Sequence, residues 1–410
     1  MPRFGVPLRF FLRFIAFALL FVLTASSSYS GRSLPHEAYV WQRQWTPALG
    51  GALKASARSV EGWRVLAAEA TPGRGLQVFT IDWNALEAAG RPVTLVVRID
   101  GRLPVVDEGL LVAISDLLKT ARARGSRIAG IEIDHDCATA RLPEYRRFLL
   151  ALRARWEERT RLSITALPAW MSSPALGSLL EAVDESVLQV HAVQDPRRGL
   201  FEMEFARASV ERYARRTARP FRVALPAYGT RVIWRDNGTL AAVESETPVL
   251  AGGSEGRELM ADPRDLALLV SDLGHAAPPN LKGIVWFRLP TGEDRRAWSL
   301  ATWQAVVAGR LPEGRVEARL VSGATPGLGE VLLANAGSGD AALPKRLRLP
   351  PGCVLADGVN GYALERAGGR FVLVRAQEGL LRGGRERAVG WARCAREEGQ
   401  LEEGKLDVEE

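Results

Sequence analysis

Eight β-type runs recur between about residue 38 and residue 310, and amphipathic helical stretches separate them. This alternation predicts a parallel sheet, because two neighbouring parallel strands need a long crossover connection. Eight such units suggest closure into a (β/α)₈ barrel, the TIM-barrel form of the α/β class. The predicted strands cover residues 39–45, 63–70, 94–100, 128–136, 162–168, 187–193, 221–227 and 283–289. The predicted helices cover residues 108–124, 143–159, 174–183, 205–217, 263–273 and 298–308.

The barrel is predicted to take residues 36–312, since this fold typically needs about 250 residues. From residue 313 the pattern changes to short alternating runs broken by Gly, Pro, Asn and Asp, which predicts a small β-sandwich-like domain over residues 313–396. We expect the acidic end, residues 397–410, to be a solvated disordered tail. Within the barrel we expect a short extra strand at 76–81 and a long excursion at 231–260, which can form a lid or cleft wall.

The first thirty residues have the order of a secretory signal. Arg3, Arg9 and Arg13 precede an apolar run at 14–25, and small polar residues follow up to position 30. This run is shorter than the roughly 20 residues that a membrane-spanning helix needs. We therefore expect residues 1–30 to be a leader, and the protein to be exported to the periplasm or the extracellular space. An uncleaved membrane anchor is the alternative.

The chain has 3 cysteines, which are too few for a disulfide scaffold. In an exported protein Cys353 and Cys394 can pair within the C-terminal domain and leave Cys137 alone; three unpaired thiols are the alternative. The net charge is +7, but the arginines are dispersed and form no basic block with interleaved aromatic residues. Nucleic acid is therefore not an expected partner, whereas the basic balance favours an anionic polymer at the cell surface.

Alternate residues of a strand share a face, so each barrel strand turns one row of side chains inward and one toward the helices. We expect the apolar rows to face the helices. The other rows then make an unusually polar interior, which is costly unless its groups are paired or used. The predicted inward-facing rows contain Arg98, Asp100, Glu132, Asp134, Asp136, Gln189, His191, Trp286 and Arg288.

Three acids alternate along the fourth predicted strand. At roughly 3.3 Å per residue, Glu132 lies about 13 Å below Asp136 and cannot share a reacting centre with it. Glu132 is therefore predicted to pair with Arg98 or Arg288. Asp134 and Asp136 lie about 6.6 Å apart along the strand, near the C-terminal rim where catalytic groups of such barrels belong. Nearby carboxylates disfavour double ionisation, so one of the two should have a raised pKa and donate a proton to a leaving oxygen.

These considerations predict Asp136 as the general acid, Asp134 as its electrostatic partner, and Asp100 and Arg288 as supporting groups. The alternative is an interior network of ion pairs and hydrogen bonds without chemistry. Aromatic residues near the strand ends predict a sugar-binding cleft, because rings stack on sugar faces. The predicted substrate-binding residues are Trp41, Gln189, His191, Tyr228, Trp286 and Arg288. For His191, a core histidine with satisfied hydrogen bonds is the alternative.

The segment from Gly130 to Asp136, together with residues 142–153, resembles the fourth strand and following helix of family 18 glycoside hydrolases, the chitinase-like barrels. Their signature is three acids at alternate positions after a glycine, the last being the acid catalyst. Carried over by position, the resemblance implies that Asp136 donates the proton and that Asp134 orients the substrate amide. It also implies that Trp286 forms the floor of the sugar site.

The sequence departs from this family at two places. Asp136 stands where the family has glutamate and is one methylene shorter. Val193 and Gln194 stand where the family has a Tyr-Asp pair late in the sixth strand. The whole chain also resembles an uncharacterised family of exported bacterial proteins described only as a domain of unknown function, through residues 39–45, 131–136 and 188–191.

Three functions remain open at this point. The first is an enzyme that cleaves a glycosidic bond of a polysaccharide, which requires a second group opposite Asp136. The second is a non-catalytic carbohydrate-binding or envelope protein that keeps the pocket. The third is a metal-dependent hydrolase or deacetylase, although acids in line along one strand make a poor metal cage, so we predict no metal or other cofactor. Candidates for the second group are Asp100, Asp134, Asp195, Glu244 and Tyr228.

Overall fold

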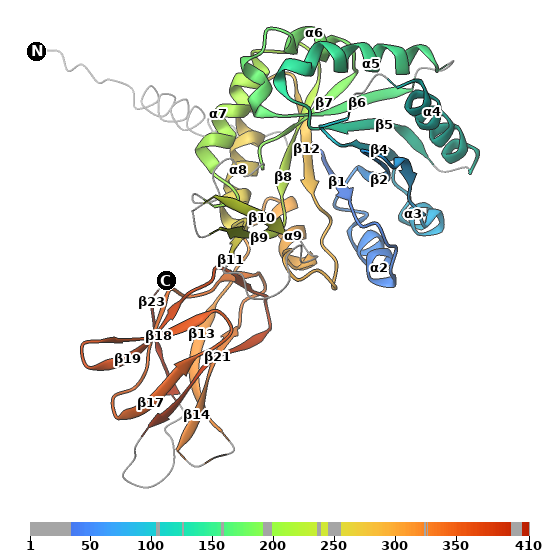
Figure 1. Cartoon of the computed structure of the whole chain (residues 1–410). Helices are drawn as coiled ribbons and strands as arrows, with labels where there is room; N and C mark the ends of the chain where they lie inside the picture. Colours follow the sequence, from blue (N-terminus) through green and yellow to red (C-terminus); the bar gives the residue numbers. More distant parts are fainter. Residues whose placement is uncertain are drawn as a thin grey trace, which may run out of the picture.

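The computed structural model describes most of the chain, and Figure 1 shows its course. The described residues are 34–103, 107–124, 127–156, 160–191, 199–235, 239–244, 256–323, 325, 327–394 and 404–409. The predicted leader, residues 1–30, lies outside them. No helix in the described ranges combines the length and apolar character needed to cross a membrane.

Eight parallel strands form a closed barrel, which confirms the predicted fold class. They follow one another in the order β1-β12-β8-β7-β6-β5-β4-β2, and β1 pairs with β2 to close the cylinder. The barrel strands are β1 (His36–Val40), β2 (Gly62–Thr71), β4 (Val93–Ile99), β5 (Ile128–His135), β6 (Arg161–Ala166), β7 (Glu185–Gln189), β8 (Phe221–Pro226) and β12 (Leu281–Phe287). The short extra strand β3 (Gly75–Val78) pairs antiparallel with β2.

Helices surround the barrel strands (Figure 1). The six helices predicted from the sequence form as α4 (Glu108–Ala123), α5 (Leu142–Ala154), α6 (Leu176–Glu181), α7 (Met203–Ala214), α8 (Pro263–His275) and α9 (Leu300–Val307). Two more, α2 (Pro47–Ser56) and α3 (Trp83–Ala89), were not predicted, and the 3₁₀ turns η1 (Thr139–Arg141) and η2 (Pro168–Ser172) precede α5 and α6. With seven residues, α3 is too short to show the helical period.

The main apolar core lies between the barrel and the helices. Leu95, Val97 and Ile99 of β4 belong to it, as do Ile131 and Ile133 of β5, and all five are buried. These two strands therefore turn their apolar rows outward, as the alternation predicts. Their polar rows are left for the interior.

The predicted excursion after β8 forms a small antiparallel sheet. It contains β9 (Gly229–Trp234), β10 (Leu240–Glu244) and β11 (Gly256–Met260) in the order β10-β9-β11. Figure 1 shows these strands between the barrel and the C-terminal domain.

The C-terminal part is built from antiparallel strands. A five-stranded sheet, β17-β21-β14-β13-β22, and a four-stranded sheet, β18-β19-β16-β23, contribute to one apolar core that includes Leu320, Leu333, Leu347 and Leu373. A disulfide joins Cys353 on β17 to Cys394 on β21, and Cys137 is a free, buried thiol. The strands are β13 (Val316–Ser322), β14 (Leu328–Asn335), β15 (Ala341–Ala342), β16 (Arg346–Arg348), β17 (Cys353–Gly358), β18 (Tyr362–Ala367), β19 (Arg370–Arg375), β20 (Leu380–Leu381), β21 (Glu386–Cys394), β22 (Gly404–Lys405) and β23 (Asp407–Glu409).

The expectation of a disordered tail over residues 397–410 is wrong for its described part. Strand β22 pairs with β13, and β23 pairs with β16. Leu406 between them is 5% exposed, and it packs in the C-terminal core together with the half-buried Val408. The acidic composition hid these two apolar residues at alternate positions, which suffice to add an edge to each sheet.

Replacing Leu406 by alanine is expected to lower the stability of the full-length protein by about 2–3 kcal/mol, because it removes a buried side chain and leaves a cavity. Urea unfolding followed by circular dichroism measures the change. The control is Asp407→Ala, since Asp407 is exposed. Equal stability of the two variants would show that the end of the chain does not pack on the domain.

Candidate active site

Asp134 lies in the barrel interior near the end of β5 and is almost completely buried. Its Oδ2 accepts a hydrogen bond from Arg98 Nη1 at 2.7 Å. Its Oδ1 accepts bonds from Thr165 Oγ1 at 2.8 Å and from Gln189 Nε2 at 3.3 Å. Donors from β4, β6 and β7 thus fix this carboxylate. Thr165 was missed in the sequence, although the same alternation along its strand, where Ser163 and Thr165 oppose Leu162 and Ile164, could have found it.

Asp136 follows the last residue of β5, and its side chain is 35% exposed. Its Oδ2 lies 3.6 Å from Arg98 Nη2. Its Oδ1 is buried and accepts no hydrogen bond from any residue the structure describes. Burial, and then the charge of Asp134, raise the pKa of Asp136 to about 6, although Arg98 acts in the opposite direction. One member of the acid pair therefore has the raised pKa that the spacing predicts.

Arg98 connects the acids to the wall of the site. Besides Asp134 and Asp136 it approaches Glu69, with 3.8 Å between Nε and Oε1, and its guanidinium lies 5.9 Å from the centre of the Trp41 ring. Burial lowers the pKa of Arg98, but the surrounding carboxylates outweigh it and raise the pKa overall. Arg98 is therefore a permanent positive charge that balances part of the acid pair.

Replacing Arg98 by methionine is expected to raise the pKa of Asp136 above its present value of about 6, because the guanidinium favours the ionised carboxylate. Carboxyl ¹³C NMR of protein with labelled aspartate measures the midpoint. The matched control is Arg43→Met, which removes an arginine that pairs with Glu69 at 2.8 Å. An unchanged or lower midpoint in the Arg98 variant would refute the electrostatic role of Arg98.

Aromatic rings gather beside the acids, with Phe287 at their centre. Its ring centre lies 5.1 Å from that of Trp41, 5.1 Å from that of His191 and 5.4 Å from that of Tyr228. Burial lowers the pKa of His191 to about 4, so the imidazole is neutral at neutral pH, and its Nδ1 has no hydrogen-bond partner among the described residues. Trp41, His191 and Tyr228 thus meet where they were predicted, around a phenylalanine that was not.

The expectation that Trp286 lies inside the barrel and forms the floor of the sugar site is wrong. The side chain is fully buried in the helix layer, where its ring centre lies 5.9 Å from that of Trp298 and its Nε1 donates to Nδ1 of His36 at 2.9 Å. The opposite row of β12, with Val285 and Phe287, joins the interior cluster. Because Ile284 and Trp286 on one row and Val285 and Phe287 on the other are all apolar, alternation could not tell the inner face of this part of β12 from its outer face.

Asp100 does not join the acid pair, contrary to the prediction. Its carboxylate accepts hydrogen bonds from Arg102 Nε at 3.0 Å, from Arg102 Nη2 at 2.8 Å and from the Arg102 backbone N–H at 2.9 Å. The hydrogen bonds from Arg102 lower the pKa of Asp100 to about 2. The turn that follows β4 therefore holds this acid as an ionised carboxylate next to the strand end.

Glu132 has other partners than the two arginines predicted from the sequence. Tyr39 donates to its Oε1 at 2.6 Å, and Arg64 pairs with its Oε2. Arg64 also lies 2.6 Å from Glu37 and 2.7 Å from Glu185. This buried cluster fills the barrel below the acid pair, and it was missed because Arg64 stands alone among apolar residues in the first half of β2.

The remaining candidates for the second group differ in position, and so does Arg288, which was predicted as a supporting residue. Arg288 donates to Asp294 Oδ1 at 2.6 Å and is close enough to Tyr228 to affect its pKa, which burial raises to about 12. Glu244 is buried in β10, with its Oε2 3.8 Å from Arg231 Nη1. Asp195 lies outside the described residues, as do Val193 and Gln194. Asp134 is therefore the described candidate that acts on Asp136, whereas Tyr228 lies beside His191 and Phe287.

Residues 89–292 match the family model described as a domain of unknown function, DUF3142. The chain contains a DUF3142 domain. This confirms the resemblance to a family described only in that way. Residues 318–395, in the C-terminal part, match a second domain of unknown function, DUF8456. No curated protein matches the chain.

Solved structures similar to this chain include two spore cortex-lytic enzymes named SleL. The Bacillus cereus enzyme has 16% identity and a TM-score of 0.50, and the Bacillus megaterium QM B1551 enzyme has 13% identity and a TM-score of 0.52. Each match covers 68% of this chain and 75% of the other. A chitinase from Chromobacterium violaceum has 15% identity and a TM-score of 0.46 over 67% of this chain and 98% of its own. The barrel of this chain therefore resembles those of the two SleL enzymes, and this likeness shows the fold alone.

Proposed function

We propose that the protein cleaves a glycosidic bond of a polysaccharide, with Asp136 as the proton donor. The observation that supports this most is the state of the Asp136 carboxyl group. It lies at the C-terminal end of a barrel strand, its pKa is raised to about 6, and its buried Oδ1 lacks a hydrogen bond from the described residues. A carboxyl group that keeps its proton near the working pH and has a free oxygen suits general acid catalysis.

In the proposed reaction, neutral Asp136 transfers its proton to the glycosidic oxygen while the bond from that oxygen to C1 breaks. The departing saccharide keeps the bonding electron pair as an alcohol. Positive charge develops at C1 and the ring oxygen, and the carboxylate of Asp134 stabilises it. Water then adds to C1 and returns a proton to Asp136. The three donors on Asp134 keep that carboxylate in one orientation.

The aromatic wall supports a saccharide as the substrate. Trp41, Phe287 and Tyr228 are half-buried rings beside the acids, and a sugar ring packs on such faces. Gln189 and Arg288 supply hydrogen-bond donors close to them. Phe287 takes the place that the sequence assigned to Trp286.

A non-catalytic carbohydrate-binding protein is the second candidate. The observation that favours it is the position of Arg98, 3.6 Å from Asp136, since a guanidinium favours the ionised carboxylate that cannot donate a proton. The aromatic wall would bind sugar equally well without turnover.

We also propose that the protein is exported. The disulfide between Cys353 and Cys394 supports this, because disulfides persist in oxidising compartments. The basic and apolar leader of residues 1–30 is in keeping with it. Cell fractionation, with mass spectrometry of the mature N-terminus, tests the proposal, and retention of a full-length chain in the cytoplasm would refute it.

A glycan panel tests the two functions against each other. Purified protein is incubated with chitin, peptidoglycan, cellulose and acidic polysaccharides, and new reducing ends are measured, with Asp136→Asn as the blank for contaminating enzymes. We expect reducing ends to form with the parent protein on at least one polymer. Binding to a polymer in pull-down assays, with equal and negligible cleavage by both proteins, would favour the binding module instead.

A further inference from the structure

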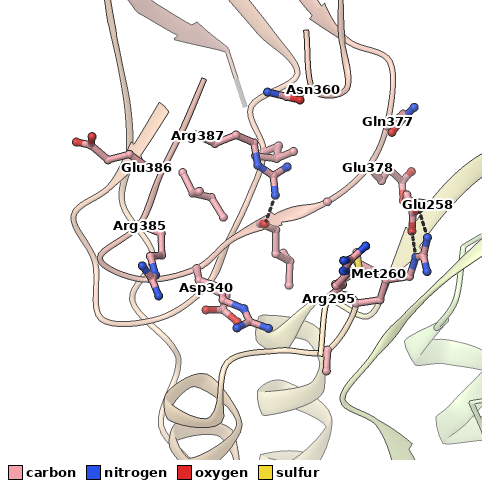
Figure 2. Close-up of a pocket in the computed structure, with 17 residues that line it drawn as sticks. Glu258, Met260, Arg295, Asp340, Asn360, Gln377, Glu378, Arg385, Glu386 and Arg387 are labelled. Atoms are coloured by element: carbon pink, nitrogen blue, oxygen red, sulfur yellow. Dashed lines mark hydrogen bonds and ion pairs between the residues drawn. The ribbon is translucent and has the colours of Figure 1, made fainter. Parts of the chain in front are cut away.

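A second pocket, separate from the barrel mouth, lies between the barrel and the C-terminal domain (Figure 2). It encloses about 500 Å³, within the range of small-molecule sites. Glu258 and Met260 of β11 and Arg295, in the segment after β12, line it from the barrel side. Arg385 and Arg387 are among the residues that line it from the C-terminal domain.

The arginines of the C-terminal wall come from one segment, Arg382-Gly-Gly-Arg-Glu-Arg387, which comprises the residues between β20 and β21 and the first two residues of β21; we call this segment the turn. A Cβ at Gly383 would lie 2.8 Å from the backbone of Ser338, and Gly384 has a φ of 70°. Both positions therefore require glycine, the first for the close approach and the second for its left-handed backbone. The turn is thus shaped so that three arginines from six consecutive residues line one pocket.

Most acidic groups of this pocket already have cationic partners. Glu258 forms a bidentate pair with Arg296, at 2.7 and 2.9 Å. Glu378 pairs with Arg257, and Glu386 pairs with Arg319 at 2.5 Å. The fourth acid, Asp340, accepts the backbone N–H of Ser299 at 2.6 Å. These carboxylates are therefore held by groups other than the arginines of the turn.

The three arginines of the turn have no carboxylate partner among the described residues. Arg382 Nη2 donates to the carbonyl oxygen of Asp294 at 2.5 Å, and Arg387 Nη2 donates to that of Leu380 at 3.4 Å. Carbonyl groups are neutral, so they leave the charge of the guanidinium unbalanced. Arg385 is exposed, and its guanidinium forms no bond with a described side chain. The pocket wall thus presents a surplus of positive charge.

We infer that this pocket binds the carboxylate groups of an acidic saccharide. A guanidinium binds a carboxylate through two parallel hydrogen bonds, and the amides of Asn360 and Gln377 in the same wall can bond sugar hydroxyls. None of the described lining residues is aromatic, so recognition would rest on charge and hydrogen bonds rather than on ring stacking. The need for an anion follows from the pocket itself, whereas the choice of a saccharide rests on the proposed function.

The pocket is connected to the candidate active site through Asp294. Arg382 binds the carbonyl oxygen of this residue, and Arg288, next to Phe287, binds its carboxylate at 2.6 Å. An acidic polymer held by the turn would therefore lie on the side of the barrel where the acid pair is located. The net charge of +7 also favours binding of an acidic polymer, because a positive net charge attracts anionic polymers.

Isothermal titration calorimetry of the full-length protein with trigalacturonate, at constant ionic strength, tests the inference. We expect the double variant Arg385→Gln, Arg387→Gln to bind at least tenfold more weakly than the parent. The methyl ester of the same trisaccharide, which lacks the charges, should also bind the parent at least tenfold more weakly. The matched control is Arg370→Gln, an exposed arginine of the same domain outside the pocket, which should bind as the parent does.

Two further comparisons distinguish a failure of this inference from a failure of the proposed function and from unfolding of the variant. Asp136→Asn is expected to bind trigalacturonate with unchanged affinity, whether or not the protein hydrolyses glycans, so the pocket can be established even if the proposed function fails. Thermal unfolding of the double variant should match that of the parent, because neither guanidinium pairs with a carboxylate of the described chain. Absence of binding by the parent, equal binding by the double variant, or equal binding of the ester would overturn the inference.

Discussion

Replacing Arg64 by methionine is expected to lower the free energy of unfolding by about 3–5 kcal/mol, because removing one partner leaves buried charges uncompensated. Arg64 is 2% exposed, and its guanidinium pairs with Glu37, Glu132 and Glu185. Glu132 and Glu185 are completely buried. Arg222, which reaches Glu185 at 3.1 Å, cannot replace all of these contacts. Urea unfolding followed by tryptophan fluorescence measures the change.

The control for this variant is Arg43→Met. Arg43 forms a single pair with Glu69 at 2.8 Å, and its side chain is 53% exposed. Exposed pairs of this kind contribute about 1 kcal/mol or less. A loss of similar size in both variants would mean that the buried cluster is not a structural requirement of the barrel.

Replacing Asp136 by asparagine is expected to lower kcat for glycan hydrolysis by about 10²–10⁴-fold, the range that a general acid contributes. Asparagine keeps the size of the side chain but has no proton to transfer to a leaving oxygen. The comparison variant is Asp100→Asn, which we expect to keep kcat near the parent value because Arg102 holds Asp100 apart from the acid pair. Loss of activity in the Asp100 variant with retention in the Asp136 variant would reverse the assignment.

We expect the dependence of kcat on pH to follow the titration of the Asp136 carboxyl group. A general acid must be protonated to act, and the pKa of Asp136 is raised to about 6. Activity should therefore be retained below this value and should fall as the pH rises through it.

The sequence allowed the prediction of the eight barrel strands and of their closure, although not of α2 and α3, because each strand alternates with a helix or a long connection. It also located the acid pair, since Asp134 and Asp136 share one face of a strand whose other face, with Ile131 and Ile133, is apolar. Regular alternation and a sharp contrast between the two faces are local properties. Both properties can be recognised in the sequence of a single strand, without knowing which strands become neighbours in the sheet.

The remaining features depend on contacts between distant parts of the chain. Phe287 and Trp286 are both apolar, so only the assembled barrel shows that Phe287 turns inward. The partner of Glu132 is Arg64, 68 positions earlier, and no spacing rule links the two. The arginines at 382–387 form no pattern in the sequence that predicts a pocket. The pocket exists only because residues of the barrel side pack opposite them.

The carboxyl titration of Asp136 tests most directly whether this residue can donate a proton. Protein with ¹³C-labelled aspartate is followed by NMR over the pH range from 3 to 9, and the resonance of Asp136 is identified by its absence from the Asp136→Asn spectrum. We predict a midpoint near pH 6, set by burial and by the charge of Asp134. A midpoint near pH 4, the ordinary value of an aspartate side chain, would contradict the assignment of Asp136 as the acid.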